Sequence, residues 1–196
     1  MRIKYNAPVT LTFTFICVGV MILSQTLFPN LIGTWFAVPG KGSFSPRSFH
    51  SWVTLCSHTI GHADWNHLIS NFSLILLLGP ILEESYGSPS LLFMMFITAL
   101  ITGIINILFI PTGLLGASGI VFMMILLASF TNFKKGEIPL TFILVLLLYL
   151  GNEVLSSFTS SNSNISHFAH ILGGICGSLF GFLRLKESNN EVMHKV

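Results

Sequence analysis

The sequence predicts an all-α membrane protein in which six transmembrane helices form one bundle. Charged side chains make up 8% of the 196 residues, whereas a soluble domain carries about 25%. Hydrophobic residues reach 52%, and they gather in runs close to the roughly 20 residues that a helix needs to cross a bilayer. A formal net charge of +2 leaves no basic surface for a nucleic acid. These observations exclude a soluble globule, a disordered chain and a nucleic-acid-binding protein.

Six apolar segments are expected to cross the membrane, and charged or turn-forming residues separate them. The first run is too long for the apolar part of a signal peptide, so we expect it to be retained. One membrane domain over residues 1–196 is expected, with no domain ahead of the first span. The predicted spans are 8–28, 66–84, 90–110, 116–132, 139–157 and 167–184, and the first loop is 29–65.

The distribution of lysine and arginine predicts the orientation, because cytoplasmic loops carry an excess of both. With the N-terminus in the cytoplasm, seven of the nine lie inside, and only Lys41 and Arg47 lie outside. Six spans then return the C-terminus to the cytoplasm. All three tryptophans, Trp35, Trp52 and Trp65, fall in the first loop. Since indole rings favour the headgroup layer, this loop is expected to lie on or dip into the outer leaflet.

Polar residues within the spans are costly and therefore mark candidate functional positions. Ser118 lies in the sequence Gly116-Ala117-Ser118-Gly119, at the predicted start of the fourth span. The two glycines remove Cβ bulk, so that a substrate or another backbone can approach the hydroxyl closely. The N-terminus of a helix also offers unpaired N–H groups, which suit an oxyanion. The alternative is that these small residues only pack two helices together.

His170 begins a pattern of small residues on the sixth span. Gly173, Gly177 and Gly181 follow at four-residue spacing, and they form one face on which another helix can pack closely. If the fourth span occupies this face, the imidazole faces Ser118. A hydroxyl paired with an imidazole is the minimum for an activated nucleophile. The alternative is a buried histidine that binds a backbone carbonyl.

His67 and Asn71 are four residues apart and share a face of the second span. Both carry side-chain N–H donors, and two such donors near a nucleophile can bind an oxyanion. Polar bonding between helices is the alternative. The only aspartate, Asp64, lies in the loop before this span. A serine enzyme of this sequence is therefore expected to use a Ser–His dyad rather than a triad.

The histidines also leave a metal enzyme open as an alternative. His58 and His62 have the i, i+4 spacing of two ligands on one helix, and His67, His167 and His170 could complete a zinc site. The sequence has no HExxH motif, so we expect neither a metal nor a cofactor. A transporter is a further alternative, but its spans would carry more polar groups and inverted repeats.

These residues resemble the rhomboid intramembrane serine proteases, in their compact six-span bacterial form. The resemblance covers roughly residues 50–185. Each motif is weak alone, and the specificity comes from their order and from their placement on the second, fourth and sixth spans. The matching pieces are His62, His67-x-x-x-Asn71, Glu83 with Gly87, Gly116-x-Ser118-Gly119, and Ala169-His170-x-x-Gly173-x-x-x-Gly177.

The resemblance implies that Ser118 is the nucleophile and that His170 is its general base. It implies that the side chains of His67 and Asn71, with the Ser118 backbone N–H, bind the oxyanion. Glu83 would hold the turn after the second span. The fifth span and residues 157–166 would be the mobile gate and cap. Further lining or supporting residues of the polar cavity would be His62, Gly116, Gly119, Phe122 and His167.

The partners implied are transmembrane-helix substrates, cut near the outer face at a small residue, and the lipid bilayer, with no nucleic acid and no metal. The expected location is the bacterial cytoplasmic membrane.

The sequence departs from the family pattern at two places: Val53-Thr54 stands where the family often carries Trp-Arg, and Phe122 stands where it often has a tyrosine stacked on the catalytic histidine. A non-catalytic rhomboid-like protein that binds transmembrane clients is an alternative, yet neither Ser118 nor His170 is lost.

Overall fold

The computed structural model describes residues 3–130, 138, 140–151 and 167–193, and for 149–151 and 184–193 it describes the backbone alone. This part of the chain is helical, and its only strand-like pairing is one antiparallel bridge between Val38 and Leu114. The all-α class is therefore confirmed for these residues. The helices are α1 (Pro8–Thr26), α2 (Leu31–Trp35), α3 (Phe49–Ser57), α4 (Trp65–Tyr86), α5 (Ser88–Phe109), α6 (Ser118–Ala128), α7 (Leu140–Val145), a π-helical turn (Leu146–Gly151) and α9 (His167–Met193).

Three helices are long and apolar enough to cross a membrane, namely α1, α4 and α5. They match the first three predicted spans to within three residues. α6 and the apolar part of α9, His167–Leu183, are shorter. The fifth predicted span coincides with α7 and the π-helical turn, and its last residues, 152–157, lie outside the described residues. The count of six spans stays a prediction.

Both ends of α6 and the end of α9 differ from the expected boundaries, and α6 ends at Ala128, four residues before the predicted end at residue 132. α6 begins at Ser118, two residues after the predicted start, because Gly116 has a φ of +112° that an α-helix does not accommodate. The α9 backbone continues to Met193, past the predicted end at residue 184. Hydropathy marks where apolar side chains end, whereas the helical hydrogen bonds can continue through charged residues beyond that point.

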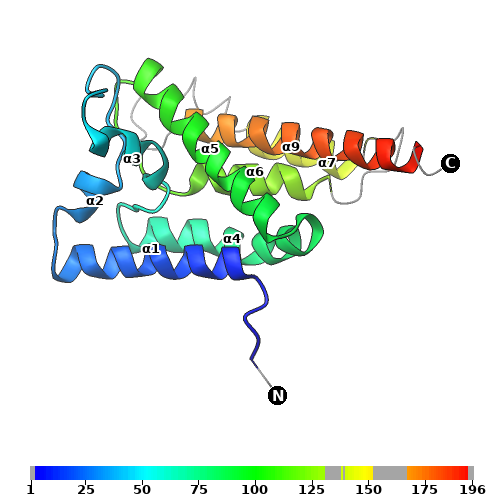
Figure 1. Cartoon of the computed structure of the whole chain (residues 1–196), viewed down its shortest axis with the longest axis horizontal. Helices are drawn as coiled ribbons and strands as arrows, with labels where there is room; N and C mark the ends of the chain where they lie inside the picture. The colour runs from blue at the N-terminus through cyan, green and yellow to red at the C-terminus, as the bar shows by residue number, and fades with distance from the viewer. Residues whose placement is uncertain (1–2, 131–137, 139, 152–166, 194–196) are drawn as a thin grey trace.

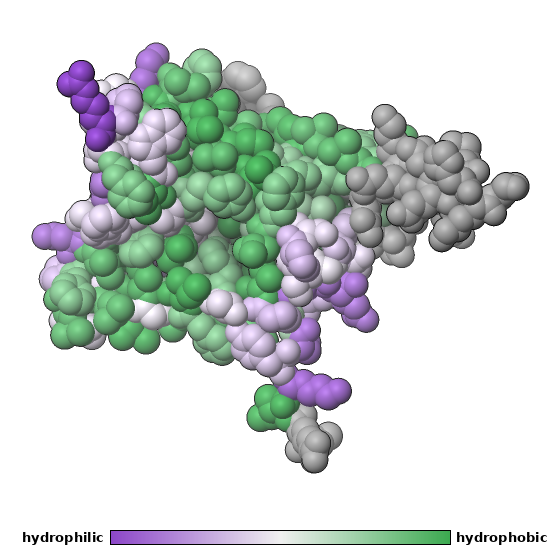
Figure 2. Space-filling view, viewed as in Figure 1, coloured by the Kyte–Doolittle hydropathy of each residue, from purple (hydrophilic) through white to green (hydrophobic). Residues whose placement is uncertain are grey.

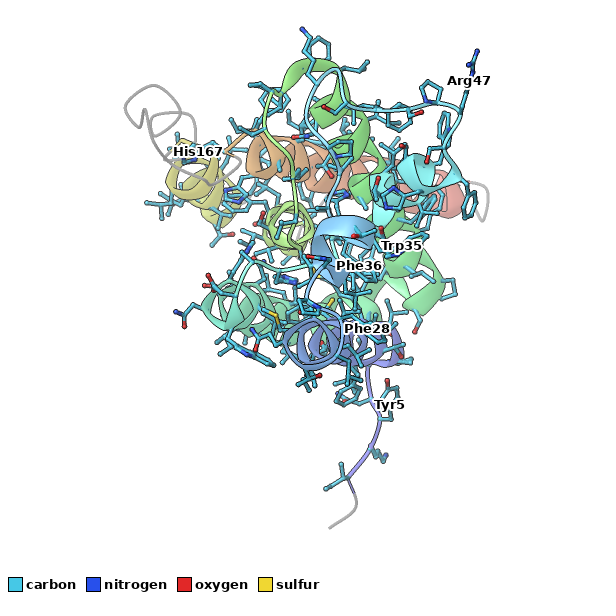
Figure 3. The ribbon with its side chains drawn as sticks, turned by 90° about the vertical axis from the view of Figure 1, so that its left-hand side faces the viewer. Tyr5, Phe28, Trp35, Phe36, Arg47 and His167 are labelled. Atoms are coloured by element: carbon cyan, nitrogen blue, oxygen red, sulfur yellow. The ribbon has the colours of Figure 1, made fainter. Side chains whose placement is uncertain are left out.

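α6 is the central helix of the bundle, with α4, α5, α7 and α9 against it (Figures 1 and 3). Eight of its 11 residues are buried, as expected of a helix with neighbours on every side. α1 packs on α4, and the first loop with α2 and α3 covers one end of the bundle. Ser118, the first residue of α6, therefore lies at the end of the bundle that the first loop covers.

α9 packs on α6 through its glycines. A Cβ atom at Gly173 would overlap with the carbonyl oxygen of Gly119, and one at Gly177 would overlap with that of Met123. A Cβ atom at Gly181 would overlap with the ring of Phe130. The backbones of the two helices thus approach as closely as small residues allow in membrane helix pairs.

The carboxylate of Glu83 joins α1 to the turn between α4 and α5. It accepts hydrogen bonds from the backbone N–H of Val9 at 2.9 Å and of Thr10 at 3.1 Å, from Thr10 Oγ1 at 2.9 Å and from Ser88 Oγ at 2.7 Å. Val9 and Thr10 lie in the first turn of α1, where N–H groups have no intrahelical partner. A buried carboxylate with four donors is stabilised without a cation, and a helix N-terminus favours negative charge.

The surface agrees with a membrane location. Apolar residues cover the middle of the face in Figure 2, and polar residues gather at the left, where the first loop lies, and near the α4–α5 turn at the lower right. Large apolar side chains such as Phe15, Leu77 and Phe93 are about 60% exposed. In water so extensive an apolar surface would aggregate, whereas a bilayer covers it.

The α6–α9 contact predicts a specific cost for Gly173→Ala. The added methyl group meets backbone, which cannot move aside as a flexible side chain can, and overpacking of this kind costs about 1–3 kcal/mol. We expect a lower melting temperature in detergent than for wild type.

Gly19→Ala is the matched control, because Gly19 lies within α1 and a Cβ atom there has nothing within 4 Å. Helix propensity alone then leaves its stability unchanged or slightly raised. If the melting temperatures of the two variants fell equally, the close α6–α9 contact would not be the cause.

Candidate active site

The segment before Ser118 is not helical, and the first loop supplies its hydrogen-bond partners. Val38 and Leu114 exchange both backbone hydrogen bonds, at 2.9 and 3.0 Å, and the Lys41 N–H donates to the carbonyl of Ile110 at 2.7 Å. Gly40 lies against the carbonyl of Pro111 with no room for a Cβ atom. Residues 38–41 thus pair with one side of the segment before Ser118, which ends within the bundle.

The last two residues before Ser118 are bound by the second half of the first loop. The Gly116 N–H donates to the backbone carbonyl of His58 at 2.8 Å. The Ala117 N–H donates to Nε2 of His62 at 3.4 Å. Backbone N–H groups in a water-poor interior need such partners. The position of Ser118 therefore depends on a loop that precedes it by more than 50 residues in the chain.

The bonds of His62 fix its tautomer and its charge. Because Nε2 accepts from Ala117, the proton lies on Nδ1, which donates to the carbonyl of Ile60 at 3.1 Å. The pKa of His62 is lowered to about 4, mainly by burial and also by the neighbouring His67, while the hydrogen bond to the Ile60 carbonyl acts in the opposite direction. Burial likewise lowers the pKa of His58 to about 4. Both imidazoles are neutral at physiological pH.

Two polar residues of α5 support the same region, and the sequence analysis assigned them no role. Asn106 donates through Nδ2 to the carbonyls of Pro39 at 3.2 Å and Thr112 at 3.0 Å, so it joins the first loop to the segment before Ser118. Thr102 Oγ1 lies 3.4 Å from Nε2 of His58. The sequence signal for Asn106 was a polar amide within a predicted span, about one turn before Pro111.

His170 lies over the face of α6 that carries Ser118. Its imidazole stacks on Phe122 with ring centroids 4.4 Å apart and planes 7° from parallel. Phe122 is four residues after Ser118, and residues i and i+4 share a helix face. Gly119 contacts Gly173 and lies near the carbonyl of Ala169. The structure therefore brings the first turn of α6 against the turn of α9 that contains His170.

His67 and Asn71 lie on the other side of this segment. A Cβ atom at Gly116 would be 2.6 Å from Cε1 and 2.7 Å from Nε2 of His67, and 3.7 Å from Nδ2 of Asn71. A Cβ atom here would overlap with the His67 ring and would be in ordinary contact with Asn71, and the positive φ of Gly116 also favours glycine. Asn71 is 7% exposed and its Nδ2 has no hydrogen-bond partner among the described residues. An unsatisfied buried donor costs about 1–3 kcal/mol, so its presence calls for an explanation.

Of the other predicted residues, His167 lies near His170 and Glu83 lies far from the site, whereas Asp64, which was given no role, caps a helix. His167 is partly buried at the start of α9, with its ring 6.4 Å from that of His170. Glu83 is 16 residues after His67 on α4, which corresponds to about 24 Å along a helix. Asp64 caps α4, since its Oδ1 accepts from the His67 N–H at 2.8 Å. The predicted cap, residues 157–166, lies outside the described residues.

The site thus combines a hydroxyl at a helix N-terminus, a nearby imidazole and several N–H donors. No side chain in the described part of the chain caps the first turn of α6, and the N–H groups of a first helical turn have no intrahelical partner. Among the described residues, no group of three or more His, Cys, Asp or Glu side chains could hold a metal ion. This set of groups can activate an oxygen nucleophile and bind a developing oxyanion.

The lowered pKa of His62 predicts a pH-dependent stability. Above its ordinary pKa of 6.5, His62 is neutral in the folded and the unfolded chain. Between that value and about 4, the unfolded chain binds the proton and the folded chain does not. The free energy of unfolding therefore decreases as the pH is lowered through this range. His62→Gln keeps an acceptor for the Ala117 N–H and does not titrate.

We therefore expect the melting temperature of His62→Gln in detergent to fall less than that of wild type between about pH 7 and about pH 4.5. His58 and other groups titrate equally in both proteins and cancel in the difference. Parallel curves for the two proteins would contradict a neutral, buried His62.

Comparison with known proteins gives a consistent family. The Rhomboid domain model matches residues 50–187. "Rhomboid protease GlpG" of Haemophilus influenzae is 25% identical over 190 residues, which cover 95% of this chain and 96% of that protein. "Rhomboid-like protein 11, chloroplastic" of Arabidopsis thaliana is 24% identical, over 78% of this chain and 60% of its own length. "Rhomboid-related protein 1" of Caenorhabditis elegans is 29% identical, over 81% and 46%.

The matched residues run from the start of α3 into α9, and they include the segments that contain His67, Asn71, Ser118 and His170. With the apolar helices that cross a membrane, the protein is an integral membrane protein. The chain belongs to the rhomboid family of intramembrane serine proteases.

Proposed function

We propose that this protein cleaves the transmembrane helices of other membrane proteins by a Ser118–His170 dyad. The single observation that carries the proposal is the stacking of His170 on Phe122, 4.4 Å between ring centroids. Phe122 follows Ser118 by one helical turn on the same face of α6, so the imidazole lies over the face that carries the hydroxyl. No carboxylate is needed to orient the imidazole, because the flat ring contact limits how it can rotate.

The chemistry follows from these two groups. His170 takes the proton of Ser118 Oγ as the oxygen attacks the scissile carbonyl carbon. The tetrahedral intermediate then breaks its C–N bond, and the imidazolium gives the proton to the leaving amine. Water hydrolyses the acyl-enzyme in the same way, with His170 again as base and then as acid. Ser118 and His170 are regenerated, one water molecule is consumed, and the products are a new carboxyl terminus and a new amino terminus.

The developing oxyanion is bound by the Ser118 backbone N–H together with Asn71 and His67. The unsatisfied Nδ2 of Asn71 supports this assignment, since it is buried beside Gly116, two residues from Ser118. A donor fixed in place before the reaction needs no reorganisation when charge develops. His67 adds a second side-chain donor from the same face of α4.

The substrate must reach Ser118 from the bilayer, while water must reach it from the outside. A peptide bond in a helix is hydrogen-bonded and shielded, so the substrate must unwind, and helix-breaking residues near the cut favour this. We therefore expect cleavage near the outer face of the membrane at a small residue. The fifth span or the first loop, or both, move to admit the substrate, and this movement limits turnover.

The number of membrane spans and the location of the termini are part of the proposed function. A single rhomboid domain over residues 1–196 has six spans, with both termini in the cytoplasm of a bacterium and the protein in its inner membrane. The polar regions at two ends of an apolar surface support such a placement (Figure 2). Lys41 and Arg47 are then the two cationic residues outside.

The dyad predicts the behaviour of Ser118→Ala and His170→Ala. Purified wild type should cleave single-span model substrates in liposomes, with no sensitivity to a metal chelator. Each variant should lose roughly 10⁴-fold or more of this activity while it keeps its melting temperature. A fluorophosphonate, whose phosphorus bonds to an activated serine oxygen with loss of fluoride, should label wild type and neither variant.

Cleavage that survives Ser118→Ala would overturn the serine mechanism, and chelator sensitivity would redirect it to the histidines. If no form cleaves any substrate but the Ser118→Ala protein retains bound transmembrane segments, the protein binds clients without catalysis.

Asn71→Ala tests the oxyanion assignment. Removal of one donor typically costs about 10²–10³-fold in kcat, and we expect a loss in this range with little change in KM. Stability should not fall, because Asn71 Nδ2 makes no hydrogen bond within the described part of the chain that the variant could lose. A variant with unchanged kcat, or one whose activity falls only in step with its melting temperature, would contradict the assignment.

A further inference from the structure

An apolar groove lies on the outside of the bundle, between α3 and α5. Its volume is about 560 Å³, within the range of ligand-binding pockets. Trp52, Val53 and Cys56 of α3 form one wall, and Phe96 and Leu100 of α5 form the other. No residue that lines it is charged. The groove is separate from the Ser118 site, which lies on the inner side of α3.

The bilayer covers the surface where this groove opens. Phe49 is 78% exposed, Trp52 54% and Phe96 51%, and these are the side chains at the rim of the groove. The chain is an integral membrane protein, and α5 is one of its clear spans. Apolar side chains of this size are exposed to hydrocarbon rather than to water. A hydrocarbon chain is therefore the chemistry that fits the groove.

A cation lies next to the groove. Trp52, on one wall, donates its indole N–H to the carbonyl of Pro46 at 3.0 Å, which joins the loop to the groove. Arg47 is the next residue, it is exposed, and its side chain reaches outward from the loop above α3 (Figure 3). A guanidinium matches the geometry of a phosphate, and an interfacial cation attracts anionic lipid headgroups.

We propose that this groove binds one acyl chain of an anionic phospholipid, with the phosphate at Arg47. The lipid comes from the leaflet that the first loop faces. Its chain packs between α3 and α5, where no side chain of the described protein fills the space. The binding depends on no catalytic assignment, because none of these residues belongs to the Ser118 site.

The opposite side of α3 gives this lipid a structural context. The carbonyl of Leu55 lies against Gly103 of α5 with no room for a Cβ atom. His58, at the end of α3, accepts the hydrogen bond of the Gly116 N–H at 2.8 Å. The helix that forms one wall of the groove thus also binds the segment before Ser118.

The test measures lipid binding to the purified full-length protein in detergent. Delipidated protein is titrated with phosphatidylglycerol or phosphatidylcholine, and the bound lipid is counted by native mass spectrometry while the melting temperature is recorded. Since lipid binds only the folded state, occupancy raises the melting temperature. Val53→Trp fills the groove. Leu77→Trp is the control, the same substitution type at an exposed position on α4 outside the groove.

We expect wild type and Leu77→Trp to retain one phosphatidylglycerol and to bind it at least about tenfold more tightly than phosphatidylcholine. Val53→Trp should lose the bound lipid and the thermal shift. Arg47→Gln should lose the preference for phosphatidylglycerol and keep the weaker binding of either lipid. Phe96→Ala removes one wall at an exposed position, and it should also weaken binding even if Val53→Trp folds poorly.

Unchanged lipid retention in both Val53→Trp and Phe96→Ala would overturn the groove as the binding site. Equal affinity of wild type for the two lipids would overturn the role of Arg47 and with it the choice of an anionic lipid. Loss of binding in Leu77→Trp as well would show a general effect of tryptophan on lipid retention and would likewise count against the groove.

Discussion

The need to pair every backbone N–H and C=O group in a bilayer dominates this structure. α6 begins partway along the bundle, so the segment before it, residues 111–117, is not helical and its N–H groups need partners from elsewhere. Its partners come from the first loop, through Val38, Lys41, His58 and His62. A loop that only connected two spans could be polar and mobile. Here the loop must be folded before Ser118 has a defined position, which accounts for its short helices and its buried side chains.

The second constraint is the distance between α6 and α9. Because the backbones touch at Gly173 and Gly177, a side chain near this contact has little room to change its rotamer. His170 lies one turn before Gly173 and stacks flat on Phe122. In the proposed dyad, packing restricts the plane of this imidazole, which is part of what a hydrogen-bonded carboxylate does in a triad. The phenyl ring in place of a tyrosine keeps that contact, since stacking needs the ring and not a hydroxyl.

The sequence predicted the helical class and the first three spans, because hydropathy and helix length are local properties. The periodicity of Gly173, Gly177 and Gly181 likewise identified a face of one helix before its partner was known. The pairing of the first loop could not be predicted in this way. The role of His62 depends on a hydrogen bond to Ala117, and that of Asn106 on carbonyls 67 residues before and six residues after it. Neither contact leaves a periodic signal, and each follows only from the tertiary arrangement.

Two features near Ser118 reduce the stability of the fold. Among the described residues, no side chain caps α6 and no group pairs with the buried Asn71 Nδ2. A sequence optimised for stability alone would cap the helix and satisfy the amide. The cost is tolerable because Glu83, the α6–α9 contact and the loop hydrogen bonds stabilise the surrounding bundle. In the proposed mechanism these donors become paired when negative charge develops between them, so that energy withheld from folding stabilises a reacting substrate instead.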